Sequence, residues 1–280
     1  MPDTEAQLAP PRGTLMAGKR GLIMGVANNR SIAWAIAQAV AAQGGEVAFT
    51  YQGEALEKRV RPLAASIGSD FLVPCDVSDD AAMDGAFAAL SQKWGKIDFL
   101  VHAIGFADKN FLRGRYVDTP RDVFLQALDI SCFSFTAVGQ RAAAMMPDGG
   151  ALLTLSYLGA ERWVPHYNVM GVAKAALEAS VRYMAADLGP DNIRVNGISA
   201  GPIKTLAASG IGDFSYIMKW NKYNSPLRRN VELEEVGSAG LYMLSDLSKG
   251  VTGEIHHVDC GYNINGMKNP DAPDLTIATE

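Results

Sequence analysis

Residues 21–42 read GLIMGVANNRSIAWAIAQAVAA and contain the features that decide the fold. Gly21–Val26 is a short apolar run, typical of a strand buried in a parallel sheet. A polar loop follows, and Ser31–Ala42 is then almost entirely apolar, which indicates a helix covered on most of its sides. We therefore predict a strand, a tight turn and a buried helix, which is the beginning of a βαβ unit.

The same alternation continues along the chain. Further short apolar runs predict strands at Val47–Tyr51, Phe71–Pro74, Ile97–Ala103, Ala151–Ser156, Ile193–Ile198 and Ile255–Val258. Helix-like segments lie at Asp80–Lys93, Pro120–Met146, Tyr167–Leu188 and Leu233–Ser245. Seven strands alternating with helices predict an α/β fold, with a doubly wound parallel sheet of the Rossmann type and helices on both faces. We expect a single domain.

Composition narrows the class of protein. The 280 residues are 48% hydrophobic and 20% charged, which excludes disorder and a coiled coil. A net charge of −5 argues against nucleic-acid binding, and no run reaches the roughly 18 consecutive apolar residues of a membrane helix. The three cysteines and four histidines show no metal-ligand spacing, so we predict reduced thiols, no metal and a cytoplasmic location.

The two ends of the chain differ from its centre. Residues 1–15 are rich in proline and polar side chains, and we expect a disordered tail, with Met16 an alternative start to Met1. The folded domain is expected over residues 16–267. Residues 268–280 are expected to form a loose C-terminal tail.

The first turn, Gly25–Ile32, is a candidate cofactor site. A doubly wound sheet binds ligands at the carboxyl ends of its strands. The turn lacks the G-x-G-x-x-G pattern, but it joins a strand to a helix N-terminus, where backbone N–H groups suit a pyrophosphate. Ser31 either caps the helix or contacts phosphate, and we favour capping.

The ends of the second and third strands indicate which cofactor is used. Gln52 is neutral and can bind a ribose hydroxyl, while the basic residues Lys58 and Arg59 lie a turn or two away. This favours NADH over NADPH. Asp76 can accept a hydrogen bond from an adenine amine, or it can cap the helix that begins after Ser78.

Tyr167 and Lys174 are the candidate reactive pair. They are seven residues apart on a predicted helix, which places them on one face at about 10 Å separation along the axis. This spacing suits a lysine on the cofactor ribose and a phenol beside the nicotinamide. We expect the cation to lower the pKa of Tyr167 and to make it an acid–base group near neutrality.

At these residues the chain resembles the short-chain dehydrogenase/reductase superfamily. Its ordinary members carry Tyr-x-x-x-Lys with a serine thirteen residues before the tyrosine, but here those positions are Met170 and Tyr157. A tyrosine one turn earlier, with a second tyrosine in the serine position, is the pattern of the bacterial enoyl-[acyl-carrier-protein] reductases. The similar segments are Gly25 with Ser31–Ala33, Ser156–Arg162, Tyr167–Gly171 and Ser199–Ile211, and the resemblance extends over about residues 16–267.

The resemblance implies reduction of a trans-2-enoyl thioester by NADH in fatty-acid elongation. Tyr167 would stabilise the enolate, Lys174 would hold the ribose, and Tyr157 would line the acyl pocket with Ala107. The cofactor residues that it implies are Gly25, Ser31, Ile32, Gln52, Asp76, Val77, Ile104, Lys174, Ile203, Thr205 and Leu206. It also implies a homotetramer and a substrate lid at about residues 203–223, whose apolar wall would include Ala207, Ala208, Ile211, Phe214, Ile217 and Met218.

In one respect the chain departs from the family. The carrier protein is acidic and the lid often carries several basic residues, but residues 212–216 are poor in charge. The candidate docking residues are therefore Lys219, Lys222, Arg228 and Arg229.

Two other functions are compatible with the fold. A short-chain ketoreductase using NADPH would require the Ser and Tyr-x-x-x-Lys register that is missing here. A non-catalytic, nucleotide-sensing protein would have no need of Tyr167 and Lys174 at this spacing. The fold alone does not separate the three functions.

Overall fold

A seven-stranded parallel sheet forms the centre of the computed structural model, which describes residues 10–206, 208 and 212–275. The strand order is β3-β2-β1-β4-β5-β6-β7, and every pairing is parallel. The strands are β1 (Arg20–Met24), β2 (Glu46–Tyr51), β3 (Leu72–Pro74), β4 (Phe99–His102), β5 (Gly150–Ser156), β6 (Ile193–Ala200) and β7 (Ile255–Val258). All seven predicted strands are present, and the predicted doubly wound fold is confirmed.

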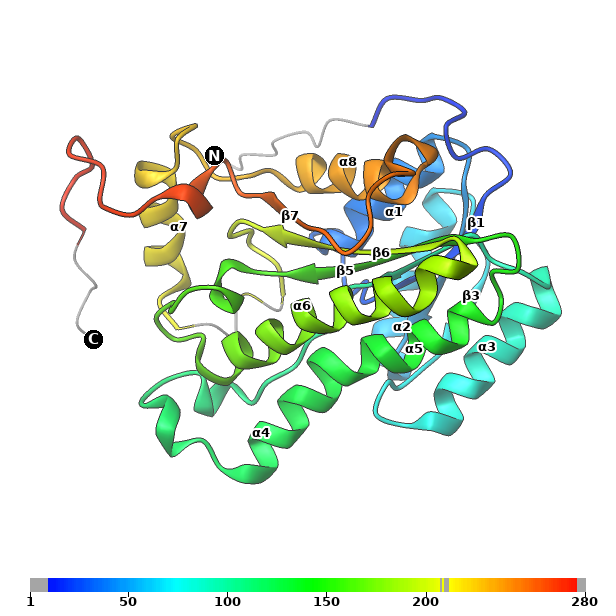
Figure 1. Ribbon diagram of the computed structural model, residues 1–280, viewed down its shortest axis with the longest axis horizontal. Helices are drawn as coiled ribbons and strands as arrows, with labels where there is room; N and C mark the ends of the chain where they lie inside the picture. The colour runs from blue at the N-terminus through cyan, green and yellow to red at the C-terminus, as the bar shows by residue number, and fades with distance from the viewer. Residues whose placement is uncertain (1–9, 207, 209–211, 276–280) are drawn as a thin grey trace.

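Helices cover both faces of the sheet (Figure 1). They are α1 (Ile32–Ala42), α2 (Gly53–Ser66), α3 (Asp80–Trp94), α4 (Arg121–Leu128), α5 (Ser134–Ala143), α6 (Asn168–Leu188), α7 (Phe214–Asn224) and α8 (Leu233–Leu244). One buried apolar cluster lies under α3, α5 and α6. A second lies under α1, α2 and α8, so the sheet is buried on both sides, as continuous apolar strands require.

The helix α2 is not among the helix ranges predicted from the sequence. Its sequence, GEALEKRVRPLAAS, is charged and includes Pro62, and only Val60 and Ala64 are fully buried. The apolar stripe is therefore too narrow to be recognised as a periodic pattern. Packing on the sheet edge supplies the stabilisation that propensity does not.

The predicted helix Pro120–Met146 is interrupted. A π-helical turn, Asp129–Phe133, separates α4 from α5, and the helix ends at Ala143. Such turns often occur at functional positions. Here the turn carries Ser131, whose buried hydroxyl accepts a hydrogen bond from the backbone N–H of Phe106 and donates one to its carbonyl.

The described parts of both expected tails are packed against helices. Gly13 donates its backbone N–H to Ala42 at the end of α1, and Met16 is buried. Asn269 donates its backbone N–H to the side chain of Asn224, at the end of α7. The outer parts of the two tails, residues 1–9 and 276–280, lie outside the described residues.

The helix α7 and the segment after β7 lie together beyond the ends of β5 and β6 (Figure 1). The strands point toward this end, so the carboxyl edge of the sheet faces α7. Trp220 of α7 donates its indole N–H to the hydroxyl of Tyr262 at 2.8 Å, which joins the two segments.

Candidate active site

Gly25 lies where β1 ends beside β4, at the point where the strand order reverses. Its φ is +94°, and a Cβ there would come within 2.1 Å of the carbonyl oxygen of Ala103. Only glycine is compatible with this close approach. The turn can therefore expose backbone N–H groups at the carboxyl edge of the sheet, where nucleotides bind in such folds.

Ser31 occupies the N-cap position of α1 but does not cap it with its side chain, so the favoured role was wrong. The Ser31 hydroxyl instead accepts hydrogen bonds from the backbone N–H groups of Ala27 and Asn28, at 3.0 and 3.2 Å. These bonds hold the preceding loop. The first N–H groups of a helix have no intrahelical partner, and α1 has no acidic residue in its first turn. Its N-terminus therefore suits an anion.

Gln52 and Asp76 lie together at the ends of β2 and β3. The Gln52 side-chain amide donates to the Asp76 carboxylate at 2.7 Å. The backbone N–H and hydroxyl of Ser78 also donate to Asp76, and the hydroxyl bond is the main reason that the pKa of Asp76 is lowered. The alternative capping role of Asp76 is excluded because Asp79 caps α3, accepting from Ala81 and Ala82.

Tyr157 and Tyr167 meet edge to face, with ring centroids 5.0 Å apart. Tyr167 stands at the N-cap position of α6, and a Cβ at Gly159 would come within 2.3 Å of its ring. Gly159 is thus required to leave room for the Tyr167 side chain. Ala107 packs against the same apolar cluster, so the three predicted substrate residues lie together.

Burial raises the pKa of Tyr167 far above its ordinary value, and the neighbouring Tyr157 and Glu178 act in the same direction. The expectation that Lys174 lowers this pKa was therefore wrong. Desolvation disfavours the phenolate by more than a nearby cation favours it. The phenol remains protonated at neutral pH and acts as a hydrogen-bond donor.

Lys174 is buried on α6, two turns beyond Tyr167. Its ammonium donates to the Leu155 carbonyl at 2.8 Å. A Cβ at Gly105 would lie 3.6 Å from Lys174 Nζ, so the end of β4 is close as well. Burial lowers the pKa of Lys174 to about 8.

The remaining predicted cofactor residues follow the third, fourth and sixth strands. Val77 is buried, and Ile104 and Ile203 are partly buried against the two cores. The Thr205 hydroxyl accepts from the backbone of Ala208, and Leu206 is about half exposed. Of the predicted lid, Ala207 and residues 209–211 lie outside the described residues, and α7 forms its second half.

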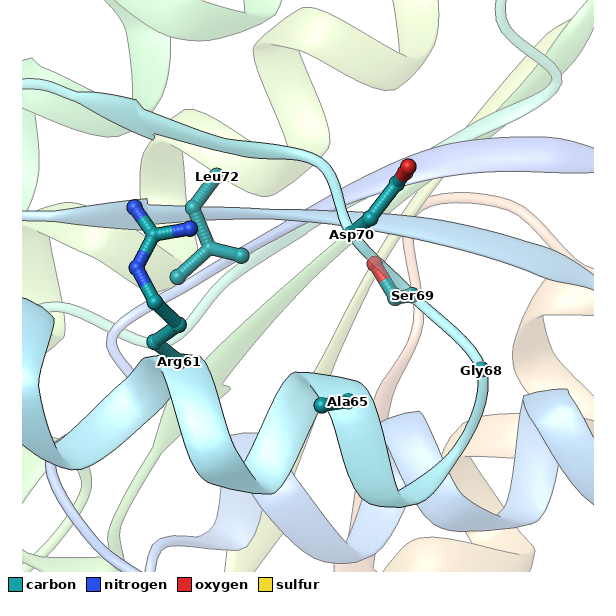
Figure 2. Close-up of a pocket in the computed structure, with 6 residues that line it drawn as sticks. All are labelled: Arg61, Ala65, Gly68, Ser69, Asp70 and Leu72. Carbon is teal, nitrogen blue, oxygen red and sulfur yellow. The ribbon is translucent and has the colours of Figure 1, made fainter.

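Of two hollows in the surface, one is next to the candidate site residues and the other is distant from them. One of about 300 Å³ reaches Tyr167 between residues 159–164 and the start of α6. The other, of about 380 Å³, lies where α2 ends and β3 begins (Figure 2). Figure 2 shows Arg61 extending from α2 beside Leu72, at the amino edge of the sheet. This second hollow is remote from the cofactor edge and is not part of the candidate site.

Comparison with known proteins agrees with this geometry. The sequence model of a family described as enoyl-(acyl carrier protein) reductase matches residues 25–263. The chain belongs to that family. The predicted relationship is therefore confirmed.

The chain is similar to enoyl-[acyl-carrier-protein] reductase [NADH] 1 of Rhizobium meliloti strain 1021, with 66% identity over 94% of this chain and 97% of the relative. It is 57% identical to the Rickettsia typhi enoyl-[acyl-carrier-protein] reductase [NADH] FabI, and the match covers 90% of this chain and 97% of that relative. A solved enoyl-(acyl-carrier-protein) reductase of Anaplasma phagocytophilum, in complex with NAD, superimposes with a TM-score of 0.91. It is 59% identical, and the match covers 95% of this chain and all of that one.

The sequence interpretation of this reductase missed three pairs of interacting residues. Ser156 donates to the buried Glu178, His166 pairs with Asp213 at 2.9 Å, and His257 pairs with Glu161 at 2.8 Å. Each pair joins segments that are far apart in sequence, so no pattern of neighbouring residues predicts it. The His166–Asp213 pair links the residue before Tyr167 to the residue before α7.

Proposed function

We propose that this enoyl reductase reduces the 2,3 double bond of a trans-2-enoyl-[acyl-carrier-protein] with NADH, in fatty-acid elongation. The observation that carries the proposal is the contact of Tyr157 with Tyr167 at the start of α6, with the buried Lys174 two turns further along that helix, near the carboxyl ends of the strands. This arrangement occurs in a chain that shares 66% identity with an NADH-dependent reductase of this class.

The residues at the carboxyl edge fit NADH. Gly25 and the N-terminus of α1 offer a backbone cradle for a pyrophosphate, and Lys174 retains donors beyond the one that it gives to Leu155. Asp76, which is ionised beside Gln52, places a negative charge near the expected adenosine ribose. That charge disfavours a 2′-phosphate, which supports NADH over NADPH.

When bound, NADH would supply the hydride for the β-carbon of the substrate, and the α-carbon would take its proton from solvent. Charge develops on the thioester oxygen during the transfer. The Tyr167 hydroxyl, kept protonated by burial, donates a hydrogen bond to that oxygen. Because the charge is greatest in the transition state, this bond lowers the barrier more than it strengthens substrate binding.

Lys174 and Tyr157 act beside Tyr167. Lys174 holds the nicotinamide ribose with its free donors while Leu155 fixes its position. Tyr157 is partly buried, and desolvation raises its pKa, so it too stays neutral. It packs against Tyr167 and closes the acyl pocket together with Ala107.

The proposed partner is an acidic carrier protein that presents the acyl thioester. Of the four candidate docking residues, Arg229 is paired with Glu235, and Arg228 donates to the Ser225 carbonyl at the end of α7. Lys219 and Lys222 are exposed on α7, so we assign docking to these two. We further propose a cytoplasmic homotetramer.

Incubation with NADH and crotonyl-CoA tests the function, with loss of the NADH absorbance as the measurement. We expect turnover with the enoyl substrate and much slower turnover with NADPH. Turnover only with 3-ketoacyl thioesters would indicate the ketoreductase. Binding of NADH without any turnover would indicate the nucleotide-sensing protein.

A further inference from the structure

Glu178 is a buried carboxyl group to which the mechanism above gives no role. It lies on α6, one turn beyond Lys174, and is only 6% exposed. The Ser156 hydroxyl donates a hydrogen bond to it. Ionisable side chains are rarely buried to this extent without a partner or a function.

Lys174 and Glu178 hold consecutive residues of β5. The Lys174 ammonium donates to the carbonyl of Leu155, and the Glu178 carboxylate accepts from the side chain of Ser156. Tyr157 is the next residue in the chain. The last two residues of β5 are thus hydrogen-bonded to two side chains of α6 that lie one helical turn apart. These bonds fix the position of the backbone from which the Tyr157 side chain extends.

The groups around Glu178 come from three elements. Lys174 and Arg182 precede and follow it by one turn on α6. Glu161 comes from the segment after β5 and is paired with His257 of β7. Burial and Glu161 raise the pKa of Glu178, whereas the hydrogen bond from Ser156 and the charges of His257 and Arg182 oppose that rise. Lys174 is a buried cation one turn away on the same helix, and the charge of Glu178 raises the Lys174 pKa.

We propose that Glu178 is a positioning residue that acts through Lys174 and Ser156. Its carboxylate keeps the buried Lys174 charged for ribose binding, and through Ser156 it fixes the backbone position of the adjacent Tyr157. The inference rests on the proposed function, because it assigns Lys174 to the NADH ribose. Residues at i and i+4 on a helix are neighbours, and a carboxylate beside a desolvated ammonium favours its charged form.

The direction of the pH effect follows from the charges. Burial already lowers the pKa of Lys174 to about 8, while Cys132 of the π-helical turn and Glu178 raise it. Removing the Glu178 charge therefore lowers this pKa further. NADH affinity that depends on the charged lysine is present below this pKa and is lost as the pH rises through it. The loss then begins at a lower pH in the uncharged variant.

Glu178→Gln tests the inference, because it keeps the shape and an acceptor oxygen but removes the charge. NADH affinity is measured by fluorescence titration between about pH 6.5 and 9.5. We expect the midpoint of the affinity loss to move down by about one pH unit. Glu178→Met removes the charge in a second way and should give the same shift, although it also removes the acceptor for the Ser156 hydroxyl.

Two variants serve as controls. Ser156→Ala leaves the Glu178 carboxylate in place, so it should keep the midpoint and lower kcat by displacing Tyr157. Glu161→Gln removes a carboxylate of the same region that is partly exposed and paired with His257, and it should leave the midpoint unchanged.

An unchanged midpoint in Glu178→Gln, or an equal shift in Ser156→Ala, would overturn the inference. If neither uncharged variant folds, as judged by circular dichroism, Glu178 belongs to the stability of the fold, and the inference is again overturned. Failure of the proposed function is distinguishable, since the unaltered protein would then fail to oxidise NADH with crotonyl-CoA.

Discussion

Tyr167 shows how environment, more than sequence spacing, fixes the chemistry of a residue. The spacing from Lys174 suggested an ionisable phenol near neutrality. In the fold the ring is enclosed by Tyr157, Met170 and Leu112, and the cost of desolvating a phenolate dominates. The residue is therefore better suited to donating a hydrogen bond to a developing enolate than to acting as a base.

Replacing Tyr167 with phenylalanine should lower kcat by roughly 10²-fold or more, since it removes a bond made chiefly in the transition state. NADH affinity should change by less than about threefold, because in the proposed mechanism Lys174, not Tyr167, holds the nicotinamide ribose. Steady-state kinetics with crotonyl-CoA and a separate NADH titration measure the two effects. Comparable losses in kcat and NADH binding would indicate that Tyr167 has only a structural role.

At the scale of single elements, tertiary packing determined helix boundaries that the local sequence pattern did not predict. Helix α2 forms from a charged segment because its Val60 and Ala64 are buried against the sheet. The run α4–α5 contains a π-helical turn that the hydrophobic periodicity does not predict. Over the described residues, Arg121–Ala143 is also the one helical run long and apolar enough to cross a membrane. Half of its most apolar window is buried within the fold, as expected for a core helix.

The exposed lysines of α7 should govern carrier binding. Changing Lys219 and Lys222 together to glutamate should raise the KM for a carrier-bound enoyl substrate by about tenfold at low ionic strength, and added salt should reduce the difference. An uncharged crotonyl-N-acetylcysteamine thioester serves as the carrier-free substrate, and its KM should not change.

A double replacement of Lys93 and Lys96 with glutamate is the matched control. It alters the net charge equally, but these lysines lie near the amino end of β4, at the opposite edge of the sheet. If both double variants raise the carrier KM equally, the effect comes from net charge, and α7 is not the docking element.

At the scale of the whole molecule, the exposed apolar side chains bear on the proposed assembly. Leu125 of α4, Phe133 of the π-helical turn and Tyr183 of α6 are each more than half exposed. Large exposed apolar side chains on neighbouring helices are typical of subunit contacts. These exposed side chains support the proposed homotetramer, in which such helices would pair across two-fold axes.

Light scattering coupled to gel filtration should give a mass of four chains for the unaltered protein. Changing Phe133 and Tyr183 together to glutamate should yield dimers or monomers, because two charges would be buried at each contact. The Lys93 and Lys96 double variant should remain tetrameric. A monomeric unaltered protein at micromolar concentration would refute the assembly.

The sequence by itself determined the parallel sheet, and it predicted the carboxyl-edge location of the cofactor residues and the roles of Tyr167 and Lys174. Strand and helix periods and a seven-residue spacing are local properties, so they can be read from neighbouring positions. The family resemblance depended on the same short segments, and it predicted the class of reaction.

Only the tertiary structure decided what the polar groups do. Ser31 fixes its loop in place of capping α1, Asp79 takes the capping role considered for Asp76, and Glu178 meets Ser156 across 22 positions of sequence. These outcomes depend on which distant segments meet and on how much water is removed around each group. Hydrogen-bond partners and desolvation are properties of the assembled fold, and a pattern of neighbouring residues does not contain them.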